Sequence, residues 1–287
     1  MAFASNRAHN WDIYLLDLLS GTLIRLTHDP GFDANPSWSP DGQWIAFESY
    51  RGGNLDIYVM SVSASGEQVR RVTTRTSTSG PASNYEPAWS PDSRALAYTT
   101  LQNGNKDVYV QLLDEPQSAI NVTNSPDLDE YDPAWSPDGT RLAYVSGPRG
   151  NPSIQVTGFD WSALAADQAQ TELFGAGTSP AWAPDGESLV YAVERGGRGH
   201  LVAASTAGWA LFHEVYNTDG LLDSLAWANL SLSARVVARA QADAPAEEPP
   251  FYVELAQPTP RAGPPYQLVP LPNVTVPPLN VVPPVTP

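Results

Sequence analysis

The sequence predicts an all-β fold built from several copies of one small antiparallel sheet, and three observations support it. A seven-residue pattern recurs along the chain at near-constant spacing. Each copy is followed by three more apolar or β-branched runs, separated by turn residues. These runs carry apolar residues on both alternating faces, which a lone sheet would leave uncovered. Together the observations predict four-stranded sheets that pack face to face.

The repeat is centred on the pattern Pro-x-Trp-Ser-Pro-Asp-Gly. It stands at residues 36–42 and returns, with at most one change, at 87–93, 133–139 and 180–186; a worn fifth copy stands at 225–229. The tryptophans step by 51, 46, 47 and 45 residues and are Trp38, Trp89, Trp135, Trp182 and Trp227. A large flat side chain at this place is expected to fill the gap between adjacent sheets. Stacking of one tryptophan on a ligand is the alternative interpretation.

The Ser-Pro-Asp-Gly segment predicts a tight hairpin turn between the first two strands of each unit. Proline presets φ at the second turn position, and glycine suits the fourth, where φ can be positive. The turn aspartates are Asp41, Asp92, Asp138 and Asp185. Ser93 replaces the glycine in one copy, so we expect a modest backbone cost there.

A ring is the arrangement in which stacked sheets leave no uncovered end. Units begin near residues 1, 36, 87, 133, 180 and 225, and the first matches only the second to fourth strands of the others. We therefore predict a six-bladed β-propeller over residues 1–256 whose first blade lacks its inner strand. The last unit would use 234–240, 251–255 and 266–269 as its later strands.

Two segments stand outside this pattern. Residues 257–287 are rich in proline and read as an extended tail or linker, with 266–269 as a candidate outer strand of the last blade. The missing inner strand is either supplied by 273–276 of this tail or lies upstream of Met1, in which case the chain is a piece of a larger protein. An insertion between Phe159 and Phe174 contains an Ala-Leu-Ala-Ala run, which predicts a short helix.

Charge and composition exclude several classes of function. With 15 basic and 31 acidic residues the net charge is −16, which argues against nucleic acid and against anionic membrane surfaces as partners. There are no cysteines, so disulfides, thiolate nucleophiles and cysteine metal sites are excluded. No apolar run approaches the roughly 18 residues of a membrane span, so no membrane insertion is predicted.

The sequence shows no catalytic constellation. It lacks the G-x-S-x-G elbow of hydrolases, a phosphate loop and a dinucleotide fingerprint, and its four histidines have no metal-type spacing. We therefore predict no catalytic residues and no cofactor.

The loops that join each fourth strand to the next first strand should emerge on one face of the predicted ring. This face would surround the mouth of the channel at the centre of the ring. The residue just before each Pro-x-Trp varies in type: Asn35, Glu86, Asp132, Ser179 and Ser224. Their polar side chains suit a partner's polar groups or a cation, whereas exposure to solvent and capping of the next strand is the simpler interpretation.

The densest acidic segment spans residues 127–132. Asp127, Asp129 and Asp132 are candidate calcium ligands, because carboxylate oxygens at close spacing suit that ion. The spacing differs from an EF-hand loop, so a solvated acidic loop is the simpler interpretation.

The combination of P-x-W-S-P-D-G, [IL]-A-[FY] and D-[IV]-Y resembles the WD-like propeller repeat of the TolB family, over about residues 1–255. TolB is the periplasmic component of the bacterial Tol–Pal system. The resemblance implies a six-bladed propeller with a central channel that binds proteins or peptides in the periplasm or at the cell surface. We predict a monomeric, non-catalytic module that does not bind nucleic acid. The same repeat occurs in propellers attached to prolyl-oligopeptidase-like and tricorn-like serine peptidases. A regulatory propeller whose catalytic domain lies outside this chain is therefore the alternative.

Overall fold

The computed structural model describes residues 1–62, 68–73, 82–102, 104–115, 118–148, 151–206, 212–219, 222 and 225. The chain divides into two compact units, one of residues 1–17 and 22–227 and the other of residues 18–21 and 228–287. Of the second unit, the structure describes only the turn at 18–21. All regular structure over the described ranges is β-strand, and no helix there could cross a membrane.

The first unit contains five antiparallel sheets whose strands pair in chain order. The first sheet has three strands: β1 (Ala2–Ser5), β2 (Asp12–Leu16) and β3 (Leu23–Arg25). The second has β4 (Asp33–Trp38), β5 (Trp44–Ser49), β6 (Asp56–Ser61) and β7 (Val69–Arg71). The third has β8 (Ser83–Trp89), β9 (Ala95–Gln102), β10 (Asn105–Leu112) and β11 (Ile120–Asn121).

The last two sheets follow the same order. The fourth has β12 (Asp129–Trp135), β13 (Arg141–Gly147), β14 (Ser153–Asp160) and β15 (Ala165–Ala176). The fifth has β16 (Thr178–Trp182), β17 (Ser188–Arg195), β18 (Arg198–Ser205) and β19 (Phe212–Thr218). The predicted four-stranded repeat is confirmed in four copies, and the N-terminal unit has the predicted three strands.

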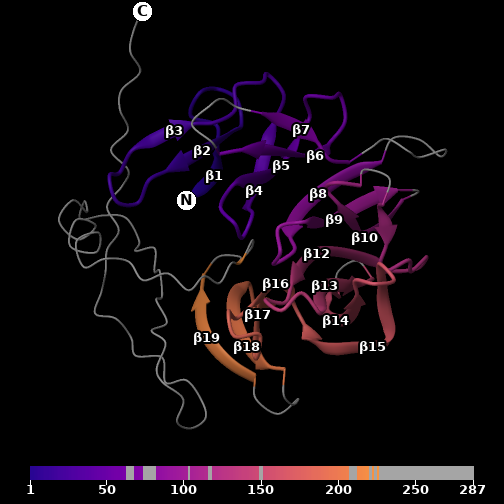
Figure 1. The fold of residues 1–287 in the computed structure, drawn as a ribbon. Helices are drawn as coiled ribbons and strands as arrows, with labels where there is room; N and C mark the ends of the chain where they lie inside the picture. The colour runs from indigo at the N-terminus through magenta and orange to yellow at the C-terminus, as the bar shows by residue number, and fades with distance from the viewer. Residues whose placement is uncertain are drawn as a thin grey trace, which may run out of the picture. The chain divides into compact units, whose positions relative to one another are not determined.

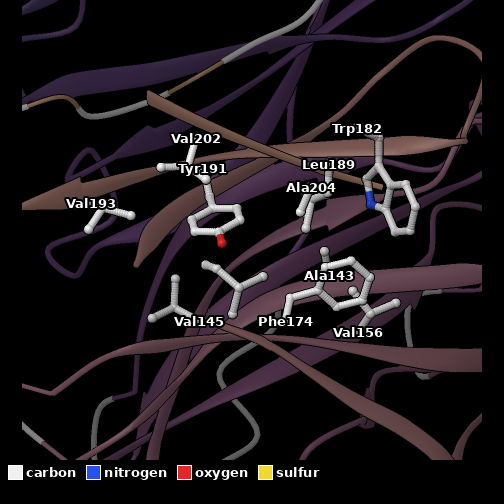
Figure 2. Packing of buried hydrophobic residues seen from close by; sticks show 11 residues of the cluster. Ala143, Val145, Val156, Phe174, Trp182, Leu189, Tyr191, Val193, Val202 and Ala204 are labelled. Atoms are coloured by element: carbon white, nitrogen blue, oxygen red, sulfur yellow. The ribbon is translucent and has the colours of Figure 1, made fainter. Parts of the chain in front are cut away.

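The hydrophobic core lies between the sheets. Each of four buried clusters draws its side chains from two consecutive sheets. In the cluster between the fourth and fifth sheets, Val145 and Phe174 face Tyr191 and Val202 (Figure 2). The sheets therefore stack face to face, as the two-sided apolar pattern predicted.

The inner strands of consecutive sheets approach one another. Strand β8 contacts both β4 and β12, and β12 contacts β16. Within this unit the sheets follow one another in chain order around an arc, with β4, β8, β12 and β16 toward its inside (Figure 1). This is the arrangement of blades in a β-propeller.

The Ser-Pro-Asp-Gly turns have the predicted geometry. The amide of Gly42 donates to the carbonyl of Ser39 at 2.9 Å, and the Ser39 hydroxyl donates to the Asp41 carboxylate at 2.6 Å. The fourth turn position has positive φ in all four copies that the structure describes: 71° at Gly42, 61° at Ser93, 71° at Gly139 and 70° at Gly186. The serine that replaces glycine thus holds a left-handed conformation, as expected.

The repeat tryptophans connect one sheet to the preceding one. Trp89, Trp135 and Trp182 are buried, and Trp38 packs against the cluster between the first two sheets. The indole N–H of Trp89 donates to the carbonyl of Ser37 at 2.9 Å, and that of Trp182 donates to the carbonyl of Ala134 at 3.0 Å. Core packing, rather than exposure to a ligand, is therefore the role of these three side chains.

The helix predicted between Phe159 and Phe174 is wrong. The segment continues β14, turns at 161–164 and returns as the long strand β15. The ring of Trp161 stacks on Trp135, with centroids 5.1 Å apart, and its N–H donates to the carbonyl of Gly139 at 2.7 Å. Tertiary packing of the aromatic rings overrides the local helix propensity of the alanine-rich run.

Several predictions concern residues outside the described ranges. They are the sixth blade, with Trp227 and Ser224, the outer strand at 266–269 and closure by 273–276. The number of blades and the manner of closure therefore stay predictions.

We expect Gly42→Ala and Ser93→Ala to lower the free energy of unfolding by different amounts, although the two residues close equivalent turns in different repeats. An alanine at position 42 meets no neighbour within 4 Å, so its cost is that of a left-handed backbone, about 1–2 kcal/mol. At position 93 the wild-type protein already carries that cost. Ser93→Ala loses only the exposed hydrogen bond from the Asp41 amide, about 0.5–1 kcal/mol. Urea unfolding of both variants checks the order, and equal costs would contradict it.

We expect Trp89→Phe to cost more stability than Trp135→Phe. Both side chains are buried to a similar degree, but the indole N–H of Trp135 has no hydrogen-bond partner whereas that of Trp89 holds the carbonyl of Ser37. The difference in the free energy of unfolding should be about 1–2 kcal/mol. A larger loss in Trp135→Phe, measured by the same unfolding method, would show that ring stacking outweighs the hydrogen bond.

Candidate partner-binding face

The connections from second to third strands, and from fourth strands to the next first strand, leave every sheet at the same end. This follows from the antiparallel order of the strands. We call this end the loop face; it includes residues 6–11, 26–32, 50–55 and 122–128. The opposite end carries the Ser-Pro-Asp-Gly turns.

Each first strand contains a bulge at the residue that the sequence marked as a candidate for the channel mouth. The φ angles are 46° at Asn35, 56° at Glu86, 56° at Asp132 and 52° at Ser179. The pairing register of all four inner strands shifts at this place. A β-bulge of this kind redirects a side chain out of the regular pleat.

Carboxylates from one sheet hold the bulge of the next sheet. Glu48 Oε1 accepts hydrogen bonds from the side-chain amide of Asn35 and from the backbone amide of Glu86, each at 2.7 Å. Glu86 Oε2 in turn accepts one from the Thr99 hydroxyl at 2.7 Å and one from the Asp132 amide at 2.9 Å. We call this series the carboxylate latch.

The latch changes the interpretation of the predicted mouth residues. The structure brings Asn35, Glu86 and Asp132 into one chain of hydrogen bonds, and Ser179 is buried at the equivalent bulge. Glu48 belongs to the same chain and was missed, because the sequence offers no signal that a strand residue faces the bulge of the next sheet. Removing Glu86 would therefore disturb the junction between two sheets as well as any partner contact.

The Glu48 carboxyl titrates at higher pH than an ordinary glutamate. Burial raises its pKa, the hydrogen bonds from Glu86 and Asn35 partly oppose that rise, and the nearby Glu86 carboxylate adds to it. The ionised form thus depends on the two donated hydrogen bonds for its stability inside the sheet junction.

Three exposed aromatic residues gather on the loop face. Trp11, Phe32 and Tyr50 are 44%, 37% and 49% exposed, and the rings of Trp11 and Phe32 lie 6.3 Å apart. The carbonyl of Trp11 accepts from the Asp33 amide, and that of Phe32 from the Tyr50 amide, each at 2.9 Å. We call these three residues the aromatic patch.

The loop beneath the aromatic patch is held in one conformation. The side-chain amide of Asn10 donates to the carbonyls of Asp29 and Gly31, at 2.7 Å and 3.0 Å. A β-carbon at Gly31 would lie 2.8 Å from the backbone nitrogen of Arg51, so the loop packs directly on its neighbour. Sequence reasoning missed the patch, although aromatic residues at otherwise polar turn positions were a usable signal.

The predicted calcium residues do not form a three-carboxylate group. Asp127 is exposed, Asp129 begins β12, where it accepts from the Lys106 amide at 3.2 Å, and Asp132 lies at the bulge. Over the residues that the structure describes, no three histidine, aspartate or glutamate side chains are grouped to hold a metal ion.

We expect Glu48→Gln to flatten the pH dependence of stability. A carboxyl whose pKa is raised by folding contributes stability below its unfolded pKa, and this contribution is lost as the pH rises through the folded pKa. The wild-type free energy of unfolding should therefore fall more than that of Glu48→Gln from about pH 4 to about pH 7. Glutamine keeps the oxygen that accepts both hydrogen bonds.

Asp41→Asn is the matched control for this titration. Hydrogen bonds from the Ser39 hydroxyl and the Gln43 amide lower the pKa of Asp41, so its contribution is present above the unfolded pKa and is lost as the pH falls. The two variants should therefore change the pH profile in opposite senses. Parallel profiles of wild type and Glu48→Gln, measured by urea unfolding, would contradict the assignment.

Comparison with known proteins agrees with this geometry. The family model described as the TolB beta propeller domain matches residues 1–85 and 75–220. A Protein TolB homolog of Chlorobaculum tepidum is 29% identical over 110 residues, which are 38% of this chain and 24% of that protein. The Tol-Pal system protein TolB of Desulfosudis oleivorans is 30% identical over 110 residues, which are 38% of this chain and 23% of that protein.

A solved structure extends the similarity over most of the chain. The crystal structure of TolB from Acinetobacter baumannii superposes with a TM-score of 0.64 and 26% identity, covering 79% of this chain and 54% of that one. The segments of the two curated relatives that match this chain make up about a quarter of the length of each relative. By the family model, which matches more than half of its residues, the chain belongs to the TolB β-propeller domain family.

Proposed function

We propose that the chain is a non-catalytic module that binds a protein or peptide partner on its loop face. The observation that carries this proposal is the aromatic patch, because large apolar side chains exposed on a rigid surface are typical anchors of protein interfaces. The hydrogen bonds from Asn10 hold the underlying loop before any partner arrives. A pre-ordered site loses less conformational entropy when it binds.

The charge of the chain indicates the chemistry of the partner. A net charge of −16 favours a partner that combines basic residues with an apolar or aromatic side chain. Nucleic acid is disfavoured by the same charge.

The remaining features of the proposal follow the family. We infer a six-bladed propeller over residues 1–256 that acts as a monomer, with residues 257–287 as a linker. The mouth of its channel would carry Asn35, Glu86, Asp132, Ser179 and Ser224. Relatives that belong to a Tol-Pal system support a place in the bacterial periplasm or at the cell surface.

We expect the aromatic patch to account for peptide binding by the purified full chain. A random peptide library displayed on phage is selected on immobilised wild-type protein, and the enriched peptides are synthesised and titrated. The triple variant Trp11→Ser/Phe32→Ser/Tyr50→Ser should bind them at least about tenfold more weakly, a loss of about 1.4 kcal/mol. Its three side chains are exposed, so its unfolding midpoint should stay close to that of wild type.

Leu173→Ser is the matched control. Leu173 is 53% exposed on β15, the outer strand of the fourth sheet, and so belongs to a different sheet from the three residues of the aromatic patch. This variant should bind the selected peptides as wild type does. Failure to enrich any peptide, or equal binding by the triple variant, would contradict the proposal.

A further inference from the structure

Four junctions between consecutive sheets repeat the same polar positions. Strand pairing establishes the equivalence: Arg25, Arg71 and Asn121 lie opposite Tyr14, Tyr58 and Tyr109. On the next sheet Asp33, Asn84 and Glu130 lie opposite Ser49, Thr100 and Ser146. Asp12 and Asp56 begin β2 and β6, and Asp107 lies near the start of β10. The next backbone amide after each aspartate donates to the hydroxyl of Thr27, Thr73 or Thr123.

In the first two junctions, each aspartate at these repeated positions pairs with an arginine. In the first, Asp12 pairs with Arg25 at 2.7 Å and Asp33 pairs with Arg51 at 3.0 Å. In the second, Asp56 pairs with Arg71 and also accepts hydrogen bonds from the Thr73 hydroxyl and the Asn84 amide, each at 3.0 Å. Each of these three aspartates therefore has its own guanidinium.

The fourth junction needs no compensation. Its equivalent residues are Ser153, Leu173 and Gly177, none of which is ionisable. At these repeated positions, charge is thus either paired or absent at three of the four junctions.

The third junction has two carboxylates and no guanidinium. Asp107 and Glu130 occupy the two acidic positions, while Asn121 stands where the first two junctions have arginine. Within the part of the chain that the structure describes, no arginine or lysine forms an ion pair with either carboxylate. The ammonium of the neighbouring Lys106 lies over the rings of Tyr131 and Tyr85, at 4.4 Å and 5.3 Å from their centroids.

Glu130 is buried without full hydrogen bonding. Its side chain is only 2% exposed, Oε1 accepts from the Ser146 hydroxyl at 3.3 Å, and Oε2 has no hydrogen-bond partner. Burial raises the pKa of both Glu130 and Asp107, Asp107 raises that of Glu130 further, and Asp129 raises that of Asp107. An ionised pair in this position requires a positive charge between or beside the carboxylates.

Hydroxyl oxygens surround Glu130, whereas Asp107 also accepts hydrogen bonds from the side-chain amides of Asn121 and Asn105. Hydroxyls of Thr123, Ser125 and Ser146 lie against the Glu130 carboxylate. Carboxylate and neutral oxygens are the ligands that calcium prefers, and a divalent ion would neutralise both carboxylates. Two carboxylates with neutral oxygens fall short of a three-carboxylate group, so such a site would not be found by counting acidic side chains.

We propose that the junction between the third and fourth sheets binds a calcium ion at the place that an arginine guanidinium occupies in the first two junctions, with Asp107 and Glu130 as its charged ligands. This site differs from the exposed loop at Asp127, and it does not depend on the proposed partner-binding role. The ion would act as a replaceable cross-link between two sheets.

Calcium alone is titrated into the full chain after chelation, in buffer of physiological ionic strength. We expect one saturable ion per chain by calorimetry and a rise in the thermal unfolding midpoint. Glu130→Gln should weaken binding at least about tenfold, and Asp127→Asn, an exposed carboxylate of the adjacent loop, should leave it unchanged. Loss of binding in Asp127→Asn but not in Glu130→Gln would place the ion in the loop and overturn the proposal.

Two further variants use the other junctions as templates. Asn121→Arg restores the guanidinium of the first two junctions, so it should raise the midpoint of the calcium-free protein and abolish its response to calcium. Arg71→Asn/Asn84→Glu gives the second junction the residues of the third, so it should add a second calcium ion per chain.

A proton is the competing occupant. If calcium does not bind, and the wild-type midpoint falls as the pH rises from about 5 to about 8 while that of Glu130→Gln does not, the two carboxylates share a proton and the proposal is overturned. Asn121→Arg, which changes no carboxylate, keeps the test decisive if Glu130→Gln fails to fold.

Discussion

Each sheet of this chain is apolar on both faces, and only another sheet can cover a face of that size. Strand β9 begins with six consecutive buried residues, and five consecutive residues of β5 are buried. In an antiparallel sheet with one solvated face, every second residue would be exposed. The four hydrophobic clusters accordingly lie between sheets, so the junction between two sheets is the unit that carries the stability of this fold.

The same constraint governs the polar groups that the junctions bury. A polar side chain buried at a junction is satisfied by the next sheet or by its own neighbours, because buried polar groups need hydrogen-bond partners. Asp56 shows this, since its partners Arg71 and Thr73 belong to its own sheet and Asn84 belongs to the next. The charge of one junction is therefore decided by segments that lie far apart in the sequence, and repeats that look alike can differ in net buried charge.

The sequence was sufficient for most of the described strands and their order, because each repeat carries its own turn chemistry and its own apolar runs. The left-handed fourth position of the turn followed from glycine, and it held even where Ser93 replaces glycine. The run around Leu164 was misread as a helix, because local propensity cannot register the stacking of Trp161 on a tryptophan from another strand. The carboxylate latch and the junction that holds Asp107 and Glu130 without a guanidinium could not be predicted from the sequence either. Both depend on which residues of different sheets lie opposite each other.

The two ends of the sheets differ in how much their connections vary from one repeat to the next. The turn end is uniform, because a left-handed fourth residue closes all four described first-to-second-strand hairpins, and in three of them a serine hydroxyl also donates to the turn aspartate. The loop face varies from one repeat to the next, and there the aromatic patch occurs on some connections and not on others. Variation is tolerated at this end because its connections can change in sequence without opening a hairpin.

The bulges of the inner strands share one backbone conformation, but their residue types differ. Glycine would adopt a positive φ at lower cost than any other residue, yet all four described bulges carry asparagine, glutamate, aspartate or serine. Such a cost persists where the side chain contributes something that glycine lacks. The side chains of Asn35 and Glu86 contribute hydrogen bonds, because the Asn35 amide and the Glu86 carboxylate belong to the carboxylate latch between sheets. The strained residues nearest the axis therefore hold neighbouring sheets together, which leaves the exposed loops above them available for recognition.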